Sequence, residues 1–96
     1  MIGGIKKVRP IKGKEREFET LFNEFKAQVR LNEPGNEYYD LYRCLKEPGS
    51  YVVMERYHDQ TALDAHGKSA HGALFFPKIR ALLEVLEVEY FEAIEK

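Results

Sequence analysis

All three histidines of the chain lie in one segment, together with a glutamate and a serine. This segment runs from Glu55 to His71, reads ERYHDQTALDAHGKSAH, and contains His58, His66 and His71. A histidine can accept or donate a proton near neutral pH, and it is also the commonest metal ligand in proteins. The segment therefore offers three kinds of chemistry: proton transfer, metal binding, or polar contacts to a small molecule.

The spacing of His66 and His71 argues against a metal site. Five residues correspond to about 140° around a regular helix, so the two rings do not share a helical face. They converge only if the helix breaks at residues 67–69, and no cysteine or carboxylate completes a ligand set at a recognised spacing. We therefore predict no metal, and we take His66 and His71 as the candidate catalytic residues. A purely structural, hydrogen-bonded role for His66 remains an open alternative.

Three other residues are candidates for contacts to a substrate. Glu55 and Tyr57 share one face of an alternating segment, and Ser69 lies between the two candidate histidines. A buried carboxylate must be paired or neutral, so Glu55 is either structural, bonded to Arg43 or a tyrosine, or a group that contacts a ligand. Tyr57 offers an aromatic wall with a polar end. His58 falls at a strand end and is expected at the surface.

The elements that must position these residues can be read from hydrophobic patterns. Residues 2–11 are rich in β-branched side chains and predict a strand, and Gly3 and Gly4 either fray its start or make room for a ligand. A helix is predicted from residue 14 to the Asn32-Glu33-Pro34-Gly35 stop. Its apolar face comprises Phe18, Leu21, Phe22, Phe25 and Val29.

The second half of the chain predicts a hairpin, a broken helix and a final strand. Alternating segments at 36–45 and 51–57 flank Pro48-Gly49, which is typical of a β-hairpin. Asp59 or Thr61 caps a helix that Gly67 ends, and Ser69 caps a further helix in which Pro77 should cause a kink or a break. Residues 85–94 alternate as a strand.

The order β-α-β-β-α-β predicts an α+β protein with the ferredoxin-like, split βαβ fold and a four-stranded antiparallel sheet. In this fold the first and last strands are neighbours. The basic first strand (Lys6, Lys7 and Arg9) then lies beside the acidic last strand, and opposite charges across a strand pair are mildly stabilising.

Length and composition limit the function further. The 96 residues form a single domain, 1–96, with a formal net charge of −1, so neither nucleic acid nor a membrane surface is an expected partner. Cys44 is the one cysteine, which excludes an intrachain disulfide and favours a cytoplasmic location. The chain has no P-loop, GxGxxG or GxSxG motif, which disfavours NTPase, dinucleotide-binding and hydrolase functions.

The segment also resembles a known family. Tyr51-x-Val53-x-Glu55-x-Tyr57-x-Asp59, followed by Ala62-Leu63-x-x-His66-x-x-Ser69-x-His71, is similar to the antibiotic biosynthesis monooxygenase family, which includes quinol monooxygenases. The turn at residues 13–15 leading to Phe18 is similar as well. The resemblance implies a homodimeric α+β barrel, with a pocket between the sheet and the helices of each subunit.

Some members of this family oxygenate phenolic or quinol substrates without a cofactor, and others are isomerases of small signalling molecules or degrade haem. The resemblance implies a cofactor-independent monooxygenase acting on a small aromatic substrate, in which His66 positions or deprotonates a hydroxyl. Tyr57 stands at the strand end, where a tryptophan is usual in this family. Phe76 and His66 stand where haem-degrading members place a histidine and a tryptophan, which disfavours haem degradation.

Two alternatives to the monooxygenase remain at this point. One is a non-catalytic, dimeric small-molecule-binding or stress-related module, since no complete catalytic constellation is visible in the sequence. The other is an isomerase of a small signalling molecule, which needs a cationic anchor near the pocket. Lys68, Lys78 and Arg80 are the candidates for that anchor.

Overall fold

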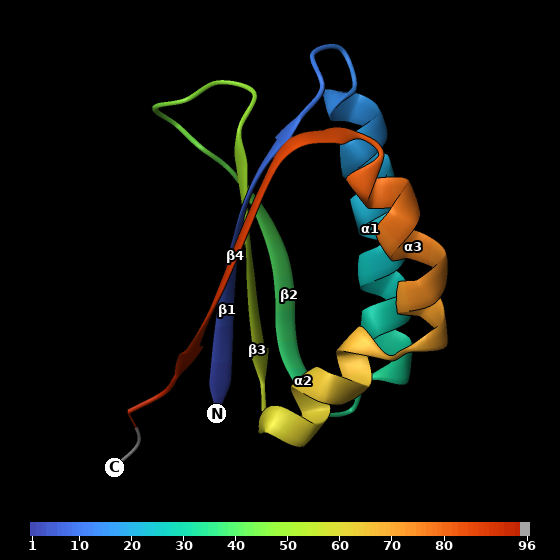
Figure 1. The fold of residues 1–96 in the computed structure, drawn as a ribbon, viewed down its shortest axis with the longest axis vertical. Coiled ribbons are helices and arrows are strands. Elements are labelled where there is room, and N and C mark those ends of the chain that lie inside the picture. The colour runs from blue at the N-terminus through green and yellow to red at the C-terminus, as the bar shows by residue number, and fades with distance from the viewer. Residues whose placement is uncertain (95–96) are drawn as a thin grey trace.

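The computed structural model describes residues 1–94 and has one sheet covered by helices on one face (Figure 1). The strands pair only in the antiparallel sense, in the order β2-β3-β1-β4. This confirms the predicted α+β, ferredoxin-like arrangement. The elements are β1 (Ile2–Pro10), α1 (Glu15–Asn32), β2 (Asn36–Arg43), β3 (Tyr51–Tyr57), α2 (Gln60–Gly67), α3 (Ala70–Arg80) and β4 (Leu83–Glu92).

The apolar face of α1 packs on the inner face of the sheet. Phe18, Phe22, Phe25 and Val29 are buried there. Phe22 stacks on Tyr39 of β2, with ring centroids 5.3 Å apart. Burying four such side chains contributes roughly 8 kcal/mol gross, as an upper estimate. This packing holds α1 against β2 and β3, which leaves room for α3 nearer to β4.

The bounds of two strands, β2 and β4, differ by two residues from the sequence prediction, and pairing explains where each strand ends. β2 ends at Arg43 rather than Leu45, because the amide of Cys44 donates to the carbonyl of Ser50 (2.9 Å) and closes the hairpin there. Gly49, with a φ of +88°, supplies the left-handed residue of this loop. β4 spans Leu83–Glu92 rather than 85–94, since its last paired residue, Glu92, faces the first paired residue of β1, Ile2.

The chain breaks between α2 and α3 as predicted. The Asp59 carboxylate accepts a hydrogen bond from the amide of Ala62 (2.8 Å) and caps α2. Ser69 Oγ accepts from the amide of Gly72 (3.0 Å) and caps α3. Pro77 does not break α3, which continues to Arg80. The break at residues 67–69 therefore turns the chain so that His66 and His71 approach a common partner.

The outer face of the sheet is open to solvent and partly apolar. Ile5, Met54 and Phe91 point away from the helices and are about two-fifths exposed, at 38%, 40% and 44%. Lys7 and Glu87 face each other across β1 and β4, as the charge pattern of the two strands predicts. Within residues 1–94, no helix has the length and apolar character needed to cross a membrane.

Candidate functional site

A cavity of about 330 Å³ lies between the inner face of the sheet and the two later helices. Its walls are mostly apolar and come from β1, α1, β2, β3, α2, α3 and β4. Among the lining residues are Lys6, Phe22, Tyr39, Val53, Leu63, His66, Phe76, Arg80, Leu86, Val88 and Tyr90. An apolar cavity with a few polar groups suits a small organic molecule. Val88 and Tyr90 are 46% and 42% exposed, so the β4 side of the cavity faces solvent.

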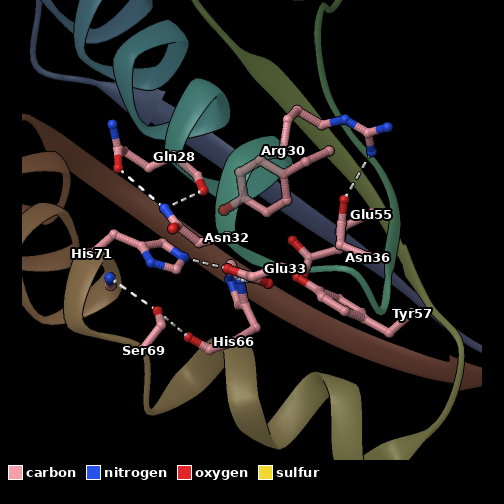
Figure 2. A network of polar contacts seen from close by, with 12 residues as sticks. Gln28, Arg30, Asn32, Glu33, Asn36, Glu55, Tyr57, His66, Ser69 and His71 are labelled. Carbon is pink, nitrogen blue, oxygen red and sulfur yellow. Dashed lines mark hydrogen bonds and ion pairs between the residues drawn. The ribbon is translucent and has the colours of Figure 1, made fainter.

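One carboxylate joins the two candidate histidines. Figure 2 shows Glu33, just beyond the last residue of α1, between the rings of His66 and His71. The Nδ1–H of His66 donates to both Glu33 oxygens, at 2.9 Å each, and Nε2 of His71 contacts Oε2. All three side chains are largely or fully buried. Glu33 therefore fixes the orientation of both rings.

The surroundings of His66 favour the neutral form of its imidazole ring. Burial lowers the pKa of His66 below its ordinary value of 6.5, although the hydrogen bond to Glu33 opposes the shift. A neutral ring whose Nδ1 carries the proton has its lone pair on Nε2. His66 lines the cavity, and its buried Nε2 has no hydrogen-bond partner among residues 1–94. A substrate hydroxyl is the type of group that would satisfy Nε2.

Glu55 is the centre of a second cluster of buried polar side chains, which reaches the cavity wall through Lys6. Its carboxylate pairs with Lys6 Nζ (3.1 Å) and accepts a hydrogen bond from Tyr57 Oη (3.2 Å). Lys6 Nζ also donates to Tyr39 Oη (3.3 Å). Burial and the charge of Glu55 raise the pKa of Tyr57 well above its ordinary value. Glu55 therefore has a structural partner set, and it holds the ammonium of Lys6 at the cavity wall.

The missing side chain of Gly4 makes room for this group. A Cβ at Gly4 would lie 2.8 Å from Tyr90 Cε1 and 2.9 Å from Glu55 Cγ, which is closer than such atoms pack. Neither prediction for the glycines of β1 fits Gly4, because β1 is paired from Ile2 and the vacated space is filled by Tyr90 and Glu55 rather than left for a ligand. The ring of Tyr90 also lines the cavity. Burial, the charge of Glu55 and a hydrogen bond to it raise the pKa of Tyr90 to about 12.

The predicted site residues are close together but differ in their relation to the cavity. His66 lines it, whereas His71, Glu55, Tyr57 and Ser69 are not among its lining residues. The Tyr57 ring packs against the His66 ring, with centroids 5.3 Å apart. Ser69 Oγ donates to the carbonyl of His66 (2.7 Å) while it caps α3. His58 is at the surface, as predicted, and pairs with Glu37 (3.2 Å).

The sequence prediction missed Glu33 and Tyr39. Glu33 stands in the stretch Asn32-Glu33-Pro34-Gly35, which indicates only the end of a helix. No spacing rule connects Glu33 with His66 and His71, which follow it by 33 and 38 positions. Within the part of the chain that the structure describes, no group of three or more His, Cys, Asp or Glu side chains is placed to hold a metal ion.

Comparisons with known proteins agree with one another. Residues 1–77 match the model of the family described as "Antibiotic biosynthesis monooxygenase". The "Putative monooxygenase YcnE" of Bacillus subtilis (strain 168) is 33% identical over 75 residues, which cover 76% of this chain and 79% of that protein.

Solved structures extend the similarity to nearly the whole chain. A "putative antibiotic biosynthesis monooxygenase" from Caulobacter crescentus has a TM-score of 0.92 and 32% identity, and the match covers 98% of this chain and 90% of that one. Rv0793 from Mycobacterium tuberculosis has a TM-score of 0.87 and 25% identity, with coverage of 99% and 96%. The similarity includes β4 and therefore the wall of the cavity that β4 provides.

Proposed function

Because the chain belongs to the antibiotic biosynthesis monooxygenase family, we propose that it is a cofactor-independent monooxygenase of a small, hydroxylated aromatic substrate. The observation that carries the proposal is the pair of Glu33 and His66, which directs a neutral imidazole with a free Nε2 to an apolar cavity. The names of the relatives in the comparisons support the class of reaction.

The first step in this proposal is proton transfer from a substrate hydroxyl to Nε2 of His66. A positioned base of this kind typically accelerates a reaction by about 10²–10⁴-fold. The Glu33 carboxylate stabilises the imidazolium that forms, since it accepts a hydrogen bond from Nδ1. The ammonium of Lys6, which is paired with Glu55, lies at the cavity wall and can donate a hydrogen bond to the phenolate. The phenolate is more electron-rich than the phenol and therefore reacts more readily with oxygen.

The substrate itself supplies the electrons. A hydroquinone and one O₂ give a hydroxyquinone and one water: one oxygen atom forms a bond to a ring carbon, and the other leaves as water. The ring loses four electrons, which reduce O₂ fully, and the proton held by His66 returns in the water. The balance requires no external reductant, which is consistent with the cofactor-free reaction that the family resemblance implies.

Oxygen uptake with a panel of quinols tests the proposal. We expect turnover by the wild-type protein, a fall of about 10²–10⁴-fold in kcat for His66→Gln, and incorporation of one atom of labelled oxygen into the product. His58→Gln is the matched control, since His58 is exposed and does not line the cavity. An unchanged rate in His66→Gln, or binding of the quinols without turnover, would contradict it. The second result would favour a non-catalytic binding protein.

We also propose that two copies of the chain associate through the outer faces of their sheets. The partly apolar outer face supports this, because soluble monomers rarely expose large contiguous apolar areas. In such a dimer each cavity remains on the inner side of its own sheet. The proposed chemistry therefore does not require a residue from the second subunit.

A further inference from the structure

The cavity has one cationic group that the proposed chemistry does not use. Arg80 lies in the last turn of α3 and lines the cavity, and its side chain is exposed. Within residues 1–94 its guanidinium makes no hydrogen bond or ion pair. The other cation at the wall, Lys6, is neutralised by Glu55 (3.1 Å). Arg80 therefore supplies the unbalanced positive charge of the cavity.

Arg80 also lies one helical turn from Phe76, whose ring packs on the proposed base. The ring of Phe76 packs against the ring of His66, with centroids 5.4 Å apart. Arg80 follows Phe76 by four residues on the same helix, which is one turn, or about 6 Å along the helix axis. A benzene ring with its substituents spans a comparable length. A substrate whose hydroxyl reaches His66 can therefore place a second substituent near Arg80.

We infer that Arg80 selects substrates that carry a carboxylate on the aromatic ring, so that the hydroxyl meets His66 and the carboxylate meets the guanidinium. This inference rests on the proposed function and adds the substrate class. The planar guanidinium matches a carboxylate with two parallel hydrogen bonds, which gives orientation as well as affinity. Lys68 and Lys78, the other cations on the helical segment, do not line the cavity.

Binding of 2,5-dihydroxybenzoate and hydroquinone, compared in the absence of oxygen, tests this inference separately from turnover. The two probes differ in the carboxylate alone. We expect 2,5-dihydroxybenzoate to bind about tenfold more tightly than hydroquinone to the wild-type protein, and we expect the two affinities to become equal in Arg80→Gln. Calorimetry or ligand-induced thermal stabilisation provides the measurement.

Lys78→Gln is the matched control, because Lys78 also belongs to the last turn of α3 and contributes equally to the charge at the helix end. It should keep the preference for the carboxylate. Equal affinity for both probes in the wild-type protein, a preference that survives in Arg80→Gln, or no binding of either probe would each overturn the inference. If the carboxylate is preferred and no oxygen is consumed, the inference stands and the proposed monooxygenase fails.

Discussion

At the scale of single residues, the sequence identified the type of group but not its environment. His66 and His71 could be named because histidines are few and the break at residues 67–69 follows from Gly67 and Ser69. Glu33, the partner of the proposed base His66, could not be named. Its contact depends on how α1 and α2 meet in space, and a glutamate at the end of a helix carries no local signal of this role.

The lowered pKa of His66 predicts how stability depends on pH. The unfolded chain takes up the proton near pH 6.5, whereas the folded chain resists it until a lower pH. The contribution of His66 to the free energy of unfolding is therefore complete above about pH 6.5 and declines as the pH falls below it.

Urea unfolding of the wild-type protein and of His66→Gln, between about pH 7 and pH 5, measures this effect. The wild-type protein should lose stability more steeply with falling pH, by up to about 1.4 kcal/mol per pH unit. Equal slopes for the two proteins would show that His66 keeps an ordinary pKa, and a shallower slope for the wild type would show a raised one.

At the scale of elements, most of the structure was predictable because local rules decide it. The face of α1, the hairpin at Pro48-Gly49 and the caps Asp59 and Ser69 follow from periodicity and side-chain hydrogen bonding. The ends of β2 and β4 could not be predicted from local rules, because a strand ends where its pairing with the neighbouring strand ends. The sequence predicted both a helix cap and a substrate contact for Ser69, and the hydrogen bond from the amide of Gly72 to Ser69 Oγ confirms the cap.

Substitution of Ser69 separates these two roles. Ser69→Ala should lower the free energy of unfolding by about 1 kcal/mol, since the amide of Gly72 loses its acceptor, and Ser69→Thr should retain most of it. KM should change little in either variant. A raised KM together with unchanged stability would support the predicted contact to substrate instead.

The two glycines of β1 offer a matched pair. Gly4→Ala should destabilise the protein by about 1–3 kcal/mol, because the new Cβ meets the Tyr90 ring and the Glu55 side chain. Gly3→Ala should be neutral or slightly stabilising, since the nearest atom to its Cβ is the Glu55 carbonyl oxygen at 4.0 Å. Chemical denaturation of both variants measures the difference. Equal stabilities would mean that Tyr90 moves aside without cost.

At the scale of the whole molecule, the order of elements was enough to predict the sheet, and the charges of β1 and β4 agreed with their pairing. The cavity could not be predicted in the same way. Its volume depends on how far α3 stands from the sheet, which the pattern of apolar residues along α3 does not encode. Tyr39 illustrates the point: its place on an alternating strand gives no sign of a cavity, and yet it lines one.

The proposed dimer can be tested by light scattering coupled to size exclusion. The wild-type protein should elute with twice the chain mass, and Met54→Asp, at the centre of the outer face, should shift it to a monomer. Leu31→Asp is the control, because Leu31 is 78% exposed on α1, on the opposite side of the sheet. A monomeric wild-type protein would contradict the association.

The position of β4 has a consequence for how function is transferred between relatives. The family model matches residues 1–77, which include His66, the proposed base, and its carboxylate partner Glu33. Arg80, Leu86, Val88 and Tyr90, which line the cavity on its solvent-facing side, all come later in the chain. Two proteins that match the family model equally well can therefore share a reaction and still differ in the substrate that they bind. Assigning a substrate requires the last strand to be compared as well.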